Sequence, residues 1–215
     1  MAKISIYDIK EELVVFLRNQ DIISISDRGV TTSQDTGTFS GDNNHTLAVN
    51  PTLVKNVRNI TVASSAIAFG TDYTVNYTTG VISFTSAQTG AYVINYDQGG
   101  SDRIYPDFPQ PYLKLNQFPR IAVDIISGNT SEFELGAGAN WSEYAVSVVA
   151  YDKDQSDTEG LVASVRSKLM DNKKTFYYST FITPTAMGPL IVSPFGQNRI
   201  FQRNQDFNIR FIYED

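Results

Sequence analysis

The spacing of apolar residues changes twice along this chain, and that change most constrains its fold. Near the N-terminus Ile9, Leu13 and Leu17 recur at helical spacing. From about residue 46 to residue 96 almost no helical period remains, and polar and apolar residues alternate as they do in β-strands. Helical spacing returns between residues 161 and 169. This pattern predicts a β-module inserted into a domain that also contains helices.

Two polar segments bound the predicted module. Residues 30–44 are rich in Thr, Gly and Asp, and residues 99–101 read Gly-Gly-Ser, so both are predicted to be linkers. Inside the module, residues 70–77 and 81–84 alternate around a Thr-Thr-Gly turn, which indicates a β-hairpin. Residues 60–62 and 91–96 are predicted as further strands. The predicted domains are a discontinuous host domain, 1–34 with 101–215, and an inserted β-domain, 35–100.

The host domain is predicted to begin with a helix that Ser5 caps and whose apolar stripe starts at Ile6, followed by a short strand over 21–27. A second helix is predicted after a capping box formed by Ser156 and Glu159. Its buried stripe would consist of Leu161, Val162, Val165 and Leu169.

Strands of the host domain are predicted over 121–126 and 131–135, with a turn at Gly128, and over 206–213. The stretch 141–151 has apolar residues on both faces, which favours a central strand. Its first residue, Trp141, is expected to be buried against a helix. The predicted fold class is α+β: an antiparallel sheet with two helices on one face, interrupted by the small all-β inserted domain.

Composition excludes several classes of function. The chain has no cysteine, so disulfides, Cys-zinc sites and thiol nucleophiles are absent. Its net charge of −6 argues against a surface that binds duplex DNA, which needs a basic face. No signal peptide and no apolar run of the roughly 20 residues that cross a bilayer is visible, so no membrane partner is expected.

Residues suited to catalysis or metal binding are few. His45, the one histidine, falls in the predicted linker and is expected to be a surface residue, which leaves no catalytic triad. Asp152, Asp154 and Asp157 could hold a cation, but their spacing fails the EF-hand pattern. They are better explained as acidic groups at the start of a helix. We therefore expect no enzyme activity, no cofactor and no metal site.

A Pro- and Gly-rich segment, 180–200, contains many apolar residues that need a surface to bury against. Either the segment folds back on its own domain, or it reaches a neighbouring subunit. On the second interpretation, the predicted interface residues are Ile182, Met187, Leu190, Val192 and Phe195.

The host domain resembles the tail terminator and tail-completion proteins of tailed phages over about 1–34 and 101–215. The similar features are the N-terminal helix, a W-x-x-Y-x-V strand from Trp141, the acidic helix start at 154–159 with its helix, and the alternating C-terminal strand. The resemblance implies a hexameric ring in the virion neck, assembled in the host cytoplasm. Its partners would be copies of itself, the tail tube protein and a head-completion or adaptor protein, with DNA passing the lumen unbound.

The inserted segment is similar to small β-modules in phage structural proteins, over residues 70–73 and 77–82. Terminators lack such a module, so other neck, tail-tube or baseplate proteins remain alternatives. A further alternative is an adhesin or carbohydrate-binding module that stacks sugars on the aromatic residues of the β-module. That platform would consist of Tyr73, Tyr77, Phe84, Tyr92 and Tyr96.

Overall fold

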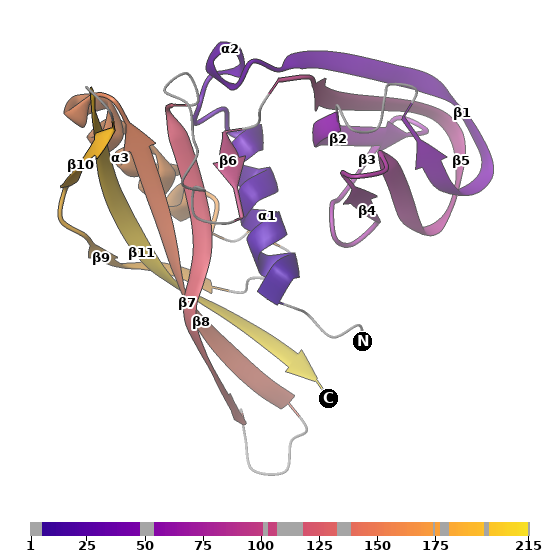
Figure 1. Ribbon diagram of the computed structural model, residues 1–215. Coiled ribbons are helices and arrows are strands. Elements are labelled where there is room, and N and C mark those ends of the chain that lie inside the picture. The colour runs from indigo at the N-terminus through magenta and orange to yellow at the C-terminus, as the bar shows by residue number, and fades with distance from the viewer. Residues whose placement is uncertain are drawn as a thin grey trace. The chain divides into compact units, whose positions relative to one another are not determined.

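The structure is a computed structural model of the 215-residue chain. It describes residues 6–47, 54–100, 103–106, 118–132, 139–173, 175–176, 181–195 and 198–214. The chain divides into two compact units (Figure 1). The outer unit consists of residues 1–23 and 103–215, and the inserted unit consists of residues 24–102. The inserted unit therefore begins before the predicted linker at 30–44 rather than after it.

The expected α+β class is wrong, because the fold is predominantly β. About 60% of the described residues lie in strands and 20% in helices, arranged as two sheets and three helices. The difference arises in segments without strong periodicity, which we expected to be linkers or loops and which form strands. Among the described helices, none is long and apolar enough to span a membrane.

The outer unit is built on a sheet with the strand order β10-β11-β8-β7-β6, and β9 also pairs with β11. The strands are β6 (Ile104–Tyr105), β7 (Arg120–Glu132), β8 (Ala139–Asp152), β9 (Phe181–Met187), β10 (Ile191–Phe195) and β11 (Asn198–Glu214). β8 lies between β7 and β11, as its apolar residues on both faces predicted. β7 continues through residues 128–129, where we expected a turn. The predicted strand at 131–135 lies only partly inside β7, and residues 133–135 fall outside the described residues.

Two helices, α1 (Ile6–Asn19) and α3 (Gln155–Asp171), pack on one face of this sheet. The predicted stripe of α1 is confirmed, because Ile9, Leu13 and Leu17 are fully buried. They share a core with Val146 and Val148 of β8 and with the α3 residues Val162, Val165 and Leu169. Ser5, the predicted cap of α1, lies outside the described residues.

The N-terminus of α3 differs from the predicted capping box. Asp154 is the N-cap, and its carboxylate accepts hydrogen bonds from the backbone N–H groups of Ser156 (2.7 Å) and Asp157 (3.3 Å). A carboxylate at this position also interacts favourably with the positive end of the helix dipole. Asp154 therefore caps the helix in place of Ser156.

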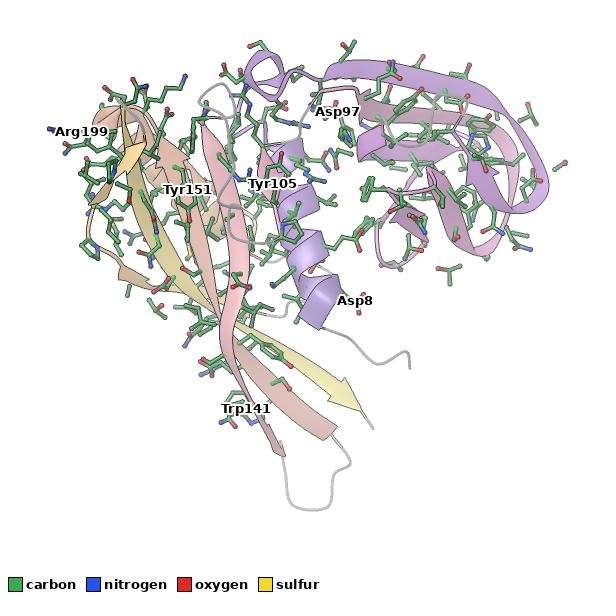
Figure 2. The ribbon with its side chains drawn as sticks, viewed as in Figure 1. Asp8, Asp97, Tyr105, Trp141, Tyr151 and Arg199 are labelled. Atoms are coloured by element: carbon green, nitrogen blue, oxygen red, sulfur yellow. The ribbon has the colours of Figure 1, made fainter. Side chains whose placement is uncertain are left out.

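The opposite face of the sheet has a smaller buried cluster: Phe118, Ala122, Val149, Tyr151 and Ile200. Trp141 is not part of either core. Its side chain is only half-buried, and the guanidinium carbon of Arg210 lies 5.0 Å from the centre of its ring. Figure 2 shows Trp141 where β8 extends beyond the helices. The expected burial of Trp141 against a helix is therefore wrong.

The inserted unit contains a short helix and a second antiparallel sheet, with the order β1-β5-β2-β3 and β4 paired to β5. Its elements are α2 (Ile25–Arg28), β1 (Thr31–Thr46), β2 (Val54–Val62), β3 (Ser65–Ile67), β4 (Tyr73–Asn76) and β5 (Val81–Gln98). The predicted hairpin is confirmed, because Asn76 pairs with Val81 and Tyr73 with Phe84. The separate strand expected at 91–96 is the second half of β5.

Two expectations about the start of this unit are wrong. Residues 25–28 form α2 instead of part of a strand, because Ser24 caps the turn and Gly29, with a left-handed φ of 65°, ends it. The predicted linker at 30–44 belongs mostly to β1, which pairs with β5 from Thr31 to Thr46. Along β1 only Phe39 is buried, so the strand lacks the apolar alternation that predicts strands.

Candidate assembly surface

Four large apolar side chains are exposed on β9 and β10, the strands that flank β11 on the side away from β8. These residues, Phe181, Met187, Ile191 and Val192, are between 44% and 48% exposed. We refer to them as the apolar edge. Exposed apolar side chains are common when single, but a group along one sheet edge is typical of a surface that binds another protein.

The backbone beneath the apolar edge belongs to the sheet of its own unit. The Gln205 side-chain amide donates to the carbonyl of Ala186 (2.9 Å), and the Gly188 N–H donates to the carbonyl of Asn204 (3.0 Å). Arg203 Nε donates to the Gly188 carbonyl over 3.3 Å. The segment is thus two edge strands joined by a fixed turn, and it does not form an arm that reaches away.

Glycine and proline explain why this segment resembles a loop in the sequence. A Cβ atom at Gly188 would lie 1.8 Å from the side-chain oxygen of Asn204, so any other residue in the turn between β9 and β10 would have to displace that side chain. Pro184 and Pro194 have no N–H to donate, and an edge strand tolerates them because only one of its sides is paired. Prolines on an edge also hinder unwanted pairing with other strands.

The predicted interface residues have different positions in this edge. Ile182 is 1% exposed and packs in the core with Ile209, so it is not available to a partner. Met187 and Val192 belong to the apolar edge, and Leu190 is half-buried. The side chain of Phe195 lies outside the described residues. Phe181 and Ile191, which were not among the predicted interface residues, complete the surface.

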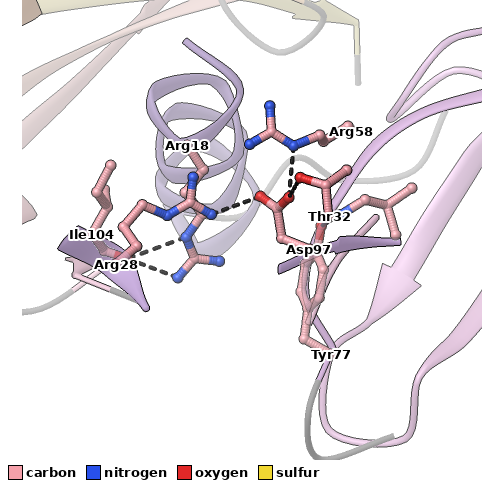
Figure 3. A network of polar contacts seen from close by, with 8 residues as sticks. Arg18, Arg28, Thr32, Arg58, Tyr77, Asp97 and Ile104 are labelled. Atoms are coloured by element: carbon pink, nitrogen blue, oxygen red, sulfur yellow. Dashed lines mark hydrogen bonds and ion pairs between the residues drawn. The ribbon is translucent and has the colours of Figure 1, made fainter. Parts of the chain in front are cut away.

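A second notable group is the buried ion-pair network of the inserted unit (Figure 3). The Asp97 carboxylate accepts hydrogen bonds from Arg28 Nη2 (2.7 Å), Arg58 Nε (2.7 Å) and Thr32 Oγ1 (3.0 Å). The side chains of Asp97 and Arg28 are both fully buried. Burial alone would raise the pKa of Asp97, but the hydrogen bonds from Arg58 and Arg28 outweigh it and hold the pKa below its ordinary value.

This network has a structural role. Both oxygens of Asp97 accept hydrogen bonds, so the carboxylate is poorly suited to take a proton from a substrate. Arg28 is the last residue of α2, Thr32 lies in the first part of β1 and Asp97 lies at the end of β5, so these contacts join the first and last elements of the inserted unit. Nothing in the sequence pattern indicated this network.

His45 lies in β1 and is half-buried, in contrast to the exposed loop position that the sequence suggested. Its Nε2 is 2.9 Å from the carboxylate of Asp35, on the same strand. The ring of Tyr92, 4.9 Å from that of His45, stacks on Phe39 at a centroid distance of 4.2 Å. Burial, followed by the nearby Asp35 charge, raises the pKa of Tyr92. The cluster packs aromatic rings between β1 and β5.

The proposed sugar platform is not assembled. Tyr73, Phe84 and Tyr96 are buried in the core of the inserted unit, so their rings cannot stack on a sugar from solvent. Tyr77 and Tyr92 pack partly against the same core. These aromatic residues therefore serve as core and cross-strand contacts.

The acidic residues at the start of α3 have separate roles. Asp154 caps the helix, while Asp152 is buried at the end of β8, where desolvation raises its pKa. Within the described part of the chain, no three His, Asp or Glu side chains are placed to hold a metal ion.

Comparison with protein-family models gave no match, and no curated protein matches the chain.

Proposed function

We propose that the chain is a structural virion protein that forms a ring at the neck of a tailed phage. In this role the ring terminates the tail tube and connects it to the head-completion proteins. The observation that supports the proposal most directly is the apolar edge. A sheet edge with four exposed apolar side chains, prolines that block strand addition and a hydrogen-bonded backbone is suited to bind a protein through its side chains.

Two further features support this proposal. The resemblance of the outer unit to tail terminators rests on the β8 strand, α3 and β11. The net charge of −6 suits a ring around DNA, since a negative lumen repels phosphates and lets the duplex pass without binding.

The proposal is tested by the mass of the purified protein, measured by light scattering during size-exclusion chromatography, and by electron microscopy of the protein mixed with tail tubes. Discrete rings, alone or at the end of a tube, are expected. A protein that stays monomeric at high concentration and does not bind tubes contradicts the proposal.

The contribution of the apolar edge is tested with Met187→Asp combined with Val192→Asp. Both side chains are exposed, so the variant should fold and should fail to assemble. Ser193→Asp is the matched control, because Ser193 is exposed on the same strand without being apolar. Normal assembly of the double variant would show that the subunit contact lies elsewhere.

A further inference from the structure

The exposed large apolar residues of the described chain all lie on one sheet, on both sides of its central strands β8 and β11. Four of them form the apolar edge on β9 and β10, and the fifth, Ile126, lies on β7. Ile126 is the most exposed of the five, at 61%. On the β7 side, the described pairing with β6 covers only Ile121 and Ala122, so Ile126 lies beyond it. The β7 edge and the apolar edge both belong to the outer unit, where β11 and β8 separate them (Figure 1).

A β-bulge places Ile126 outside the regular pairing of its strand. Ile125 pairs with Val146 and Ser127 with Ala145, so Ile126 is an extra residue opposite no partner on β8. Ile125 packs against the core, whereas residues 126–129 are exposed. A bulge commonly re-aims a side chain, and here it exposes an isoleucine at the edge of the sheet.

The strand register places the two edges at the same height along the sheet. The neighbours of Ile126 pair with Val146 and Ala145 of β8. On the other side of β8, these two residues pair with Phe207 and Asn208 of β11. Those two residues pair in turn with Pro184 and Thr183 of β9. Ile126 is therefore level with the middle of β9, between Phe181 and Met187 of the apolar edge.

We propose that the β7 edge of one copy, centred on Ile126, packs against the apolar edge of a second copy, centred on Phe181 and Met187. The occupant is a second copy because one chain carries both the protruding Ile126 and, at the same height on the other side of the sheet, the exposed side chains of the apolar edge. The contact is between unlike edges, so each subunit uses both of its edges. This inference rests on the proposed function and specifies its subunit interface.

The shared height favours a ring. Contacts between unlike surfaces produce rings when the rotation closes and filaments when each step also climbs. When the two contacting edges lie at the same level, each subunit is added with little displacement along the strand direction, and this favours closure. Pro184 and Pro194 lack N–H groups, so the contact would be formed by side chains instead of a continuous intermolecular sheet.

Cysteine cross-linking tests this contact. The chain has no cysteine of its own, so any disulfide must form between the introduced residues. Three variants are oxidised and run on non-reducing gels: Ile126→Cys, Phe181→Cys and the two combined. The combined variant should give a ladder of covalent oligomers that ends at the ring order. Each single variant should stay monomeric, and an equimolar mixture of the two should stop at dimers.

The matched control combines Phe181→Cys with Ser164→Cys, an exposed position on α3, and should give no ladder. Disulfide dimers from either single variant would show that like edges meet, which overturns the proposal. No cross-link in the combined variant, under conditions where the wild type is oligomeric, overturns the edge contact and leaves the ring proposal standing. A wild-type protein that never assembles would contradict both the edge contact and the ring proposal.

An independent measurement is self-association of Ile126→Asp, with folding checked by circular dichroism. Placing a charge in an apolar contact should weaken assembly by at least about tenfold. Asn129→Asp, exposed on the same strand, is the control. Assembly of Ile126→Asp at wild-type strength would overturn the proposed contact.

Discussion

At the level of single residues, removing either partner of the ion pair between Asp97 and Arg28 should strongly destabilise the inserted unit. Both side chains are fully buried, and removing one partner leaves the other charge without its counter-ion in a dry environment. We expect Asp97→Asn to lower the free energy of unfolding by about 3 kcal/mol or more. Urea denaturation measures this change, and Asp171→Asn on the exposed end of α3 should change it little. A loss no larger than the control's would contradict the stabilising role.

The same carboxylate should make the inserted unit sensitive to acid. The pKa of Asp97 is lower in the folded protein than the value of about 3.9 expected when unfolded. The unfolded state therefore binds the proton first, and stability that is present above about pH 4 is lost as the pH falls. Unfolding free energies between about pH 3 and pH 6 should fall more steeply for the wild type than for Asp97→Asn. Parallel curves would exclude this contribution.

Glu11 on α1 should produce a pH dependence of opposite sign in the outer unit. Burial, and then the charge of Asp8, raises the pKa of this partly buried carboxyl to about 7. The folded state then binds the proton more tightly, so stability falls as the pH rises from about 4.5 towards 7. Because solvent screens this carboxyl in part, Glu11→Gln should be more stable than the wild type at pH 8 by only about 1 kcal/mol. Equal stability is expected only below about pH 4, where the carboxyl is protonated in both states, and Asp8→Asn should give a smaller effect. An unchanged pH slope would contradict the shifted pKa.

At the level of elements, the turn between β9 and β10 depends on Gly188. A side chain there would collide with Asn204, so Gly188→Ala should shift the apolar edge and lower stability by about 1–3 kcal/mol. Gly160→Ala is the matched control, because its Cβ would meet open space in the middle of α3. That change should stabilise the helix by up to about 1 kcal/mol. Thermal unfolding distinguishes the two, and equal effects would show that the turn adapts.

The elements that the sequence predicted well are those whose side chains are buried at regular positions, on one face or on both. α1 and the β4–β5 hairpin have regular spacing of buried side chains, and β8 is apolar on both faces. The edge strands were missed for the opposite reason. β1 buries one side chain, and β9 and β10 contain prolines, so backbone pairing with a neighbour determines these strands instead of side-chain burial. Such pairing is non-local and leaves little trace in the sequence.

The candidate surfaces were predictable only in part, for a related reason. The sequence located the apolar segment at 180–200, but it could not separate Ile182, which faces the core, from Phe181, which faces solvent. That distinction depends on the register with β11. Ile126 was hidden in an apparently regular strand, because a bulge of one residue is visible only once the pairing is known. The Arg28–Asp97 pair joins residues 69 positions apart, which no local pattern reveals.

For the whole molecule, the decisive feature is that each unit has a core of its own. The cores of the outer unit draw on α1, α3 and its own sheet, and the core of the inserted unit draws on residues between Phe39 and Tyr96. The chain enters and leaves the inserted unit at nearly the same point. A Cβ atom at Gly100 would lie 2.1 Å from the carbonyl oxygen of Gly29, and pairing of β1 with β5 begins directly beyond, at Thr31 and Gln98.

The two ends of the outer unit that flank the insertion are also held near one another. The Arg18 guanidinium, near the end of α1, donates two hydrogen bonds to the carbonyl of Ile104 on β6, at 2.7 and 3.2 Å. A short bridge can therefore replace the insertion without breaking either core, as nested domains with adjacent termini allow.

We predict that replacing residues 24–102 with a short Gly/Ser bridge leaves the outer unit folded, and that residues 24–102 alone also fold. Each protein should show one cooperative thermal transition by circular dichroism, and the outer unit should keep a near-ultraviolet signal from packed aromatic residues. The matched control deletes residues 31–98 only, which leaves α2 attached without the strands that its Arg28 needs, and it should be less stable than the full replacement. If the outer unit loses its cooperative transition in both deletions, the two units depend on each other for folding. If it folds and still forms rings, the ring contacts belong to the outer unit, as the β7 and β9–β10 edges require.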